Sequence, residues 1–176
     1  MYIRQVQPNE AHLVAGVLTA AAVALVDKGE VLWDLAEVTQ AAVDGHVRAG
    51  MYYAAFDDEG PVGVFRFQLE DRYFWPEVPE GSSAFVHKLA VCPHKQGRDL
   101  AQVLLRHACD LTRELGLQFL RLDCVSARPR LRAMYERFGF HHHSQKTLGD
   151  RTFDRFEFKV VKADASHADQ RGQAPA

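Results

Sequence analysis

The chain has 176 residues, of which 47% are hydrophobic and 25% are charged, and these values are typical of a folded globular protein. That length suits one domain with a sizeable core and is too short for two ordinary domains. Because 21 Lys and Arg residues stand against 23 Asp and Glu residues, no overall charge draws the chain to nucleic acid or to an anionic membrane.

The cysteines and the opening residues indicate the compartment. Cys92, Cys109 and Cys124 are odd in number and lack the paired spacing of a zinc site or a disulfide framework, which favours a reducing compartment. Residues 1–10 have neither a basic start nor an apolar secretory core, and no apolar run approaches the roughly 20 residues that span a bilayer. We therefore expect a soluble, cytoplasmic protein with no membrane partner.

The first third of the chain predicts a strand followed by two helices. A strand is expected over residues 1–7. A helix rich in Ala, Leu and Val follows over residues 10–29 and ends at a glycine. A second helix is expected over residues 34–50, with Asp34 as its N-cap and Glu37 as the capping-box partner three residues on.

The rest of the chain predicts six more strands and two more helices. Residues 51–57 and 62–70 read as an antiparallel hairpin, and residues 71–83 read as a loop because they hold prolines, a glycine and a cluster of aromatics. The later elements are a central strand over 84–91, a helix over 97–115, a strand over 118–125, a helix over 128–139 and a hairpin over 141–160. This order predicts one α/β domain over residues 1–162, a mixed sheet with helices on its faces. Residues 163–176 have nothing to bury and are expected to form a flexible tail.

Two stretches resemble the GNAT superfamily of N-acetyltransferases. "LAVCPHKQGRDLAQVLL" is similar to the acetyl-coenzyme A motif, a strand ending Leu-Ala-Val, a Pro, and then Gln or Arg, two residues, Gly, one residue, and Gly or Ala. "LRAMYERFGF" resembles the second signature, a helix that carries a Tyr before Gly-Phe. The resemblance implies the GNAT fold, a mostly antiparallel sheet of about seven strands with about four helices, and acetyl-coenzyme A as the cofactor.

The turn before the helix at residue 100 is the expected cofactor site. A helix N-terminus presents unpaired backbone N–H groups and a favourable dipole to an anion. Pyrophosphate contacts are expected from Gln96, Gly97, Arg98, Asp99, Leu100 and Ala101. Lys95 and Arg98 would add positive charge. The alternative is an ordinary strand–helix turn with solvated basic residues.

The resemblance implies further cofactor contacts, and the sequence departs from the family pattern at two positions. It implies that the backbone of Leu89, Ala90 and Val91 holds the pantetheine arm, and that Arg128 contacts the cofactor where many members have an asparagine. Asp99 replaces the motif's glycine, and a carboxylate there opposes a phosphate. These departures leave open a catalytically idle acyl-coenzyme A binding or regulatory module as the alternative to an enzyme.

Amine acetylation needs a proton acceptor for the substrate ammonium and a proton donor for the leaving thiolate. The resemblance places Tyr135 as the donor; the alternative is a tyrosine that packs under the sheet. His87, two residues before Leu89, is the candidate base because histidine titrates near neutral pH. A histidine satisfied by its neighbours, with water carrying the proton, is the alternative.

Substrate contacts are expected in the loop after residue 70. Acids such as Glu70, Asp71 and Glu77 stand beside the aromatics Tyr73, Phe74 and Trp75, and together they can hold an ammonium by charge and by cation–π attraction. Of these we select Tyr73, Trp75 and Glu77. The aromatics could instead anchor the loop to the core. The amine, whether small molecule or peptide, is not named by the sequence.

The remaining features give negative or open expectations. The run His141 to His143 is expected to lie solvated on an edge strand, and no metal site is predicted. A homodimer is possible. The sequence therefore predicts an N-acetyltransferase that joins acetyl-coenzyme A and a primary amine in a ternary complex, by direct attack.

Overall fold

The computed structural model describes residues 1–30, 32–97 and 99–160. Its elements follow the predicted order, except that the helix predicted over 34–50 is divided into η1 and α2 and a short 3₁₀ helix, η2, is added. In chain order they are β1 (Tyr2–Gln5), α1 (Ala11–Val26), η1 (Leu35–Val38), α2 (Gln40–Arg48), β2 (Tyr52–Asp57), β3 (Gly60–Gln68), β4 (Ser83–Val91), η2 (Pro93–Lys95), α3 (Leu100–Glu114), β5 (Phe119–Val125), α4 (Pro129–Phe138), β6 (His141–Leu148) and β7 (Arg151–Lys159). The predicted tail, residues 163–176, lies outside the described ranges.

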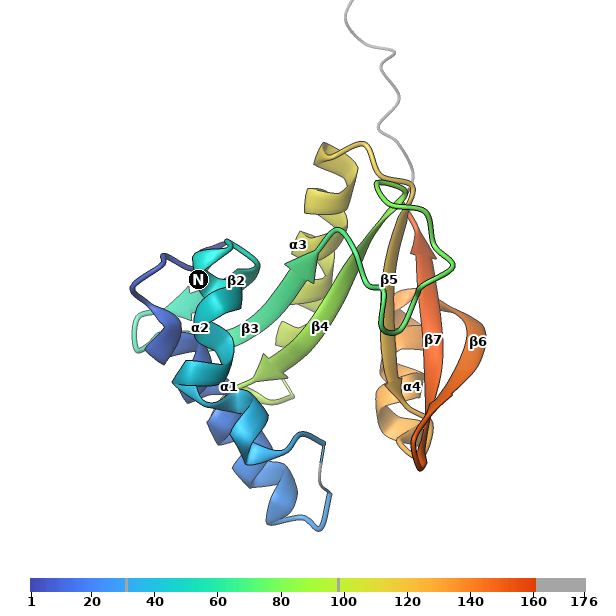
Figure 1. Cartoon of the computed structure of the whole chain (residues 1–176). Helices are drawn as coiled ribbons and strands as arrows, with labels where there is room; N and C mark the ends of the chain where they lie inside the picture. The colour runs from blue at the N-terminus through green and yellow to red at the C-terminus, as the bar shows by residue number, and fades with distance from the viewer. Residues whose placement is uncertain (31, 98, 161–176) are drawn as a thin grey trace, which may run out of the picture.

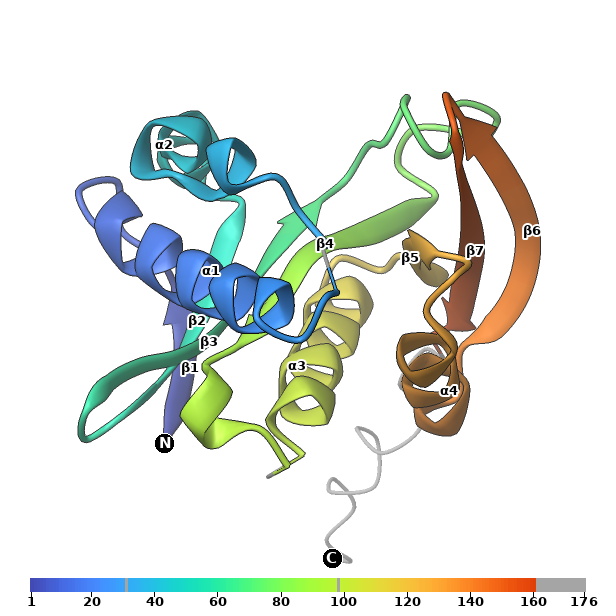
Figure 2. The ribbon, with the colours of Figure 1, turned by 90° about the horizontal axis from the view of Figure 1, so that it is seen from below.

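The seven strands form one sheet in the order β1-β2-β3-β4-β5-β7-β6. Only β4 and β5 pair in parallel; the other neighbours are antiparallel. Helices α1 and α2 cover one face of the sheet and α3 and α4 cover the other (Figures 1 and 2). This arrangement confirms the predicted fold, a mixed and mostly antiparallel sheet flanked by helices.

Each face of the sheet has its own hydrophobic core. The core under α3 and α4 includes Leu104, Leu105 and Phe156, and the core under α1 and α2 includes Leu18 and Val64. The alternation of side chains along each strand divides them between these two cores. In the described part of the chain, no helix has the length and apolar character needed to cross a bilayer.

The second predicted helix is divided in the structure, and its predicted capping box is wrong. The Asp34 carboxylate accepts from the N–H of Ala36 at 2.9 Å and starts η1, whereas the Thr39 hydroxyl accepts from the N–H of Ala42 at 3.2 Å and starts α2. Each cap satisfies an N–H that the helix leaves unpaired. Glu37 reaches away from Asp34, and its carboxylate pairs with Lys88 Nζ at 2.7 Å.

Candidate active site

The central feature of the sheet is the point where β4 and β5 separate. Their paired residues run from Ser83 with Phe119 to Val86 with Leu122, although β4 continues to Val91 and β5 to Val125. Figure 1 shows the two strands diverging beyond that point. On the other side of β4, the register with β3 shifts between Val64 and Arg66, and Lys88 takes a φ of 49°. This bulge bends β4 away from β5.

A groove of about 430 Å³ lies between α3, α4 and the diverging end of β4, and we call it the outer groove. Most of the residues predicted to hold the cofactor line it: Leu89, Val91, Gln96, Gly97, Asp99, Leu100 and Ala101. Ala90 stands on β4 between two of them and pairs with Val64. The predicted contact Arg98 lies outside the described residues.

The basic side chains of the outer groove differ from the expected set. Arg128 is not among the residues that line it; its guanidinium pairs with Glu30 at 3.0 Å. Arg130 and Arg137 of α4 line the groove in its place. Lys95 does line it, but its ammonium lies 2.8 Å from both Asp57, the last residue of β2, and Glu59 in the turn that follows. These hydrogen bonds raise the pKa of Lys95.

Asp99 occupies the position at which the backbone turns into α3. Its φ of 53° is left-handed, which explains why a glycine suits this position, and its side chain makes no capping hydrogen bond. The first intrahelical bond of α3 runs from the N–H of Val103 to the carbonyl of Asp99. The preceding N–H groups therefore have no partner within the helix and face the turn, as an anion site requires.

A second cavity, of about 340 Å³, opens where the strands part, and we call it the inner chamber. Leu89 and Leu131 line both cavities, so the two are adjacent. The polar and aromatic residues of the inner chamber are Trp33, Glu37, Arg66, Phe74, His87, Lys88, Asp123 and Tyr135. Both predicted catalytic residues, His87 and Tyr135, are thus brought to one cavity.

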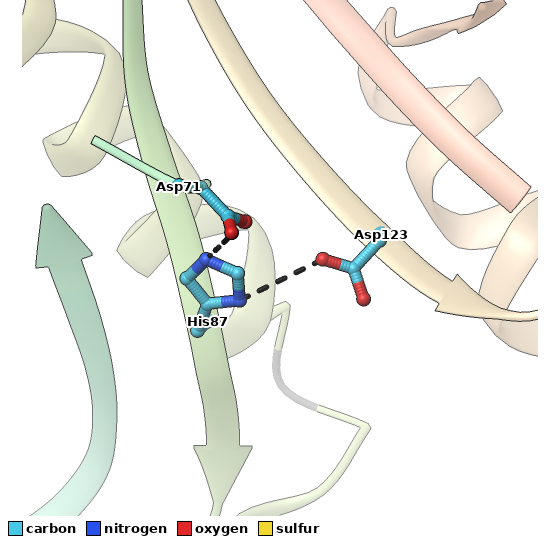
Figure 3. Close-up of side chains that lie close together, drawn as sticks. All are labelled: Asp71, His87 and Asp123. Carbon is cyan, nitrogen blue, oxygen red and sulfur yellow. Dashed lines mark ion pairs between the residues drawn. The ribbon is translucent and has the colours of Figure 1, made fainter. Parts of the chain in front are cut away.

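His87 is held between two carboxylates (Figure 3). Its Nε2 lies 3.1 Å from Asp71 Oδ2, and its Nδ1 lies 3.6 Å from Asp123 Oδ1. All three side chains are nearly buried. Asp71 is itself fixed, because its other oxygen accepts from the N–H groups of Tyr73 and Phe74 at 3.1 and 2.9 Å. Each ring nitrogen of His87 therefore has a carboxylate nearby.

The two carboxylates have different affinities for a proton. Burial raises the pKa of Asp123 to about 6, with the charge of Asp71 adding to that effect and His87 opposing it. Burial acts in the same sense on Asp71, but the contact with His87 and the N–H groups of Phe74 and Tyr73 outweigh it and lower the pKa of Asp71. Such a difference between neighbouring acids is typical of proton-transfer sites.

The same three side chains offer ligand atoms within 4.8 Å of one another, the spacing of a metal site. However, the two aspartates contact different nitrogens of the ring, as Figure 3 shows. The lone pairs of these nitrogens diverge, and a metal ion takes only one of them. The arrangement therefore suits an imidazole between two carboxylates.

Tyr135 projects from α4 into the hydrophobic core under α3 and α4. Its ring packs against Phe140 and Phe156, with centroids 5.9 and 6.0 Å away, and the residue is 6% exposed. Burial raises its pKa above the ordinary tyrosine value, with Cys124 and Asp123 adding to the effect. The phenol is therefore protonated at neutral pH and can act as a hydrogen-bond donor.

The residues predicted for substrate binding lie elsewhere. Trp75 is 1% exposed, and the guanidinium groups of Arg155 and Arg121 lie 4.6 and 5.0 Å from its ring. Glu77 pairs with Arg155 at 2.6 Å, and Tyr73 is 65% exposed. None of the three lines the inner chamber. Trp75 anchors the loop, the alternative that the sequence left open for the aromatics, and Glu77 also holds the loop through Arg155. Phe74 is the loop's aromatic in the chamber.

Sequence reasoning missed Asp123 and Arg66. Asp123 follows Leu120 and Leu122 on a strand of mostly apolar pattern, and an acid in such a strand is a signal of a buried site. Arg66 carried the same signal on β3.

Comparisons with known proteins agree with this architecture. Residues 25–140 match the model of the acetyltransferase (GNAT) family. The chain belongs to this family. Its GNAT domain makes it an acyltransferase, as predicted. YesJ of Bacillus subtilis, described as an uncharacterized N-acetyltransferase, is 26% identical over 162 residues, which cover 84% of this chain and 85% of YesJ.

Solved GNAT structures share the fold. A GNAT-family acetyltransferase from Listeria monocytogenes superposes with a TM-score of 0.75 at 18% identity, covering 90% of this chain and 94% of its own. The protein yncA from Salmonella typhimurium, solved with its cofactor acetyl-CoA, has a TM-score of 0.70 at 14% identity and covers 96% and 98% of the two chains. At these identities the likeness concerns the fold.

Proposed function

We propose that this GNAT enzyme transfers the acetyl group of acetyl-coenzyme A to a primary amine by direct attack within a ternary complex. The observation that carries the proposal is the position of His87, which lies between Asp71 and Asp123 in the same chamber as Tyr135. The chamber adjoins a groove that ends at the N-terminus of α3. The cosubstrate is acetyl-coenzyme A, the cofactor with which yncA was solved.

The outer groove supplies the features that coenzyme A needs. The backbone N–H groups at the start of α3 suit the pyrophosphate, and Arg130 and Arg137 add positive charge. Lys95 contributes less positive charge because its ammonium already pairs with Asp57 and Glu59. The backbone of Leu89 to Val91 has no strand partner on its β5 side and can hydrogen-bond to the pantetheine amides. In this arrangement the thioester lies where the two cavities meet.

The chamber residues divide the proton transfers between them. The substrate ammonium gives a proton to His87, its nitrogen attacks the thioester carbonyl, and the carbon–sulfur bond breaks. Asp71 and Asp123 stabilise the imidazolium that forms. Tyr135 donates to the departing thiolate, and the second proton of the amine nitrogen restores the phenol. The products are an amide and free coenzyme A, with one proton released to solvent.

The cysteine in the chamber does not suit a covalent acetyl-enzyme. Cys124 lines the chamber, but burial raises its pKa to about 12, and the charges of Asp154 and Asp123 act in the same sense. The thiol is therefore protonated at neutral pH and is a poor nucleophile. This favours direct attack by the amine.

Thiol release from acetyl-coenzyme A with a broad panel of primary amines tests the proposal. Release with at least one amine, lost in His87→Gln and strongly reduced in Tyr135→Phe, is expected. No release with any amine, together with a rise in Tm on adding acetyl-coenzyme A, would indicate a binding module instead.

A further inference from the structure

Arg66 stands beside His87 in the sheet. The two residues are direct partners in the β3–β4 register, and Asp123 is the next residue after the last β4–β5 pair. Side chains of directly paired residues project from the same face of a sheet, with Cβ atoms about 5 Å apart. A cation, an imidazole and a carboxylate therefore follow one another across three neighbouring strands, and all three line the inner chamber.

Arg66 has no carboxylate partner among the residues that the structure describes. Its Nη1 lies 3.2 Å from His46 Nε2, and its Nε is buried without a hydrogen-bond partner in the described ranges. Arginine only donates hydrogen bonds, so His46 must accept with a neutral ring. Burial, aided by the charges of Arg66, His87 and Lys88, lowers the pKa of His46, which agrees with that role.

The other cation of the chamber is already neutralised. Lys88 Nζ lies 2.7 Å from the carboxylate of Glu37 and 5.1 Å from the centre of the Trp33 ring. Arg66 is thus the guanidinium of the chamber, and its Nε–H is available to donate a hydrogen bond to a ligand. A partly buried guanidinium is costly without an anion and favours binding one.

The inner chamber is therefore dipolar. Asp71 and Asp123 flank His87, where the amine reacts, and Arg66 lies one strand away. A polyamine would place a second cation against Arg66, whereas a carboxylate would pair with it. Trp33 and Phe74 line the same cavity and offer apolar surface to the rest of the acceptor.

We propose that the acceptor is an amino acid, whose amine lies at His87 and whose carboxylate pairs with Arg66. This inference rests on the proposed acetyl transfer and adds the class of amine. Because Arg66 and His87 are directly paired and line the same cavity, an acceptor whose amine and carboxylate are a few bonds apart, as in an α-amino acid, can contact both. Trp33 and Phe74 favour an apolar or aromatic side chain.

Matched pairs of acceptors test this directly. Thiol release from acetyl-coenzyme A is measured with phenylalanine, its amide and phenethylamine, and with leucine, its amide and 3-methylbutylamine. The wild-type kcat/KM is expected to be about 10- to 100-fold higher for the carboxylate member of each set, the range for a hydrogen bond to a charged group. Equal values, or a preference for the amines without a carboxylate, would overturn the inference while leaving acetyl transfer intact.

Variants assign the preference to Arg66. Arg66→Met is expected to remove the preference for the carboxylate member, so that kcat/KM falls at least about 10-fold more for phenylalanine than for phenethylamine. Arg66→Lys, which keeps the charge, is expected to retain part of the preference. The control is Arg48→Met, because Arg48 lies outside the chamber and pairs with Asp44 on the surface of α2. A preference that persists in Arg66→Met would overturn the role of Arg66.

A binding measurement separates this inference from the proposed activity. Calorimetry with phenylalanine and with phenethylamine needs no turnover. If the wild-type protein binds phenylalanine and Arg66→Met does not, the inference is supported even when no thiol is released. The absence of thiol release would then count against the proposed acetyl transfer and not against the role of Arg66. Binding of phenylalanine that is unchanged in Arg66→Met, or absent from the wild-type protein, would overturn it.

Discussion

His87 and Asp123 face each other across the point where β4 and β5 separate, with His87 Nδ1 3.6 Å from Asp123 Oδ1. They are the first residues beyond the paired segment of the two strands. The separation of the two strands therefore places an imidazole and a carboxylate together in the inner chamber. The inner chamber and its two ionisable side chains therefore lie where the β4–β5 pairing ends.

Replacing the Asp123 carboxylate is expected to reduce activity. Asp123→Asn removes the charge that stabilises the His87 imidazolium, and a loss of about 10- to 100-fold in kcat/KM is expected, within the range for general-base catalysis. Because the pKa of Asp123 is about 6, wild-type kcat/KM should fall more steeply than that of the variant as the pH drops through that value. Asp110→Asn, on the surface of α3, is the control; an unchanged pH profile in Asp123→Asn would contradict the assignment.

The same substitution is expected to stabilise the fold. The pKa of Asp123 is raised from 3.8 to about 6, so the folded state binds the proton more tightly than the unfolded state. The favourable contribution is complete below pH 3.8 and is lost as the pH rises through 6. At pH 8 the ionised side chain costs up to about 3 kcal/mol. Chemical denaturation of Asp123→Asn should show a gain at pH 8 that disappears at pH 4; a loss at both pH values would refute this.

Tyr135→Phe is expected to separate catalysis from folding. The ring keeps its contacts with Phe140 and Phe156, so the free energy of unfolding should change by no more than about 1 kcal/mol. The thiolate loses its donor, and kcat should fall by about 100-fold while KM for acetyl-coenzyme A changes little. Tyr53→Phe on β2, outside both cavities, is the matched control. Equal kcat in wild type and Tyr135→Phe would remove Tyr135 from the mechanism.

The fold and the outer groove could be predicted from the sequence because their signals are local. The strand, the turn and the helix start on one side of the groove follow one another from Leu89 to Ala101, so one motif places them, whereas Arg130 and Arg137 come from α4 and were not predicted. The inner chamber could not be predicted in the same way. Asp71 comes from a loop and Asp123 from β5, and only the strand register and the β4 bulge bring them to His87.

The positions of Trp75 and Glu77 outside the inner chamber have a similar cause. The acids and aromatics after residue 70 suggested an ammonium site, but Arg155 from β7 pairs with Glu77 and lies over Trp75. That partner is far away in sequence, so local composition could not reveal that these residues anchor the loop. Arg66 was overlooked because its position beside His87 depends on the register shift in the neighbouring strand.

The two arginines at the start of α4 are expected to behave differently. Arg130 lines the outer groove, whereas Arg128 pairs with Glu30. Arg130→Met should raise the Kd for acetyl-coenzyme A by about 3- to 10-fold at low salt, with a smaller effect at high salt because exposed charges are screened. Arg128→Met should leave this Kd within about twofold. Calorimetry at two salt concentrations measures both, and the reverse ranking would show that Arg128 is the cofactor contact.

Asp99→Gly is expected to improve both stability and cofactor binding. A left-handed φ of 53° costs an L-residue up to about 1–2 kcal/mol, less for aspartate, and glycine removes that cost. The substitution also removes an exposed carboxylate from the outer groove, so the Kd for acetyl-coenzyme A should fall severalfold at low salt and less at high salt. Asp150→Gly, in the β6–β7 turn, controls for the loss of one acid. An unchanged or weaker affinity in Asp99→Gly, measured by calorimetry, would show that the carboxylate points away from the phosphates and that only the backbone conformation matters at this position.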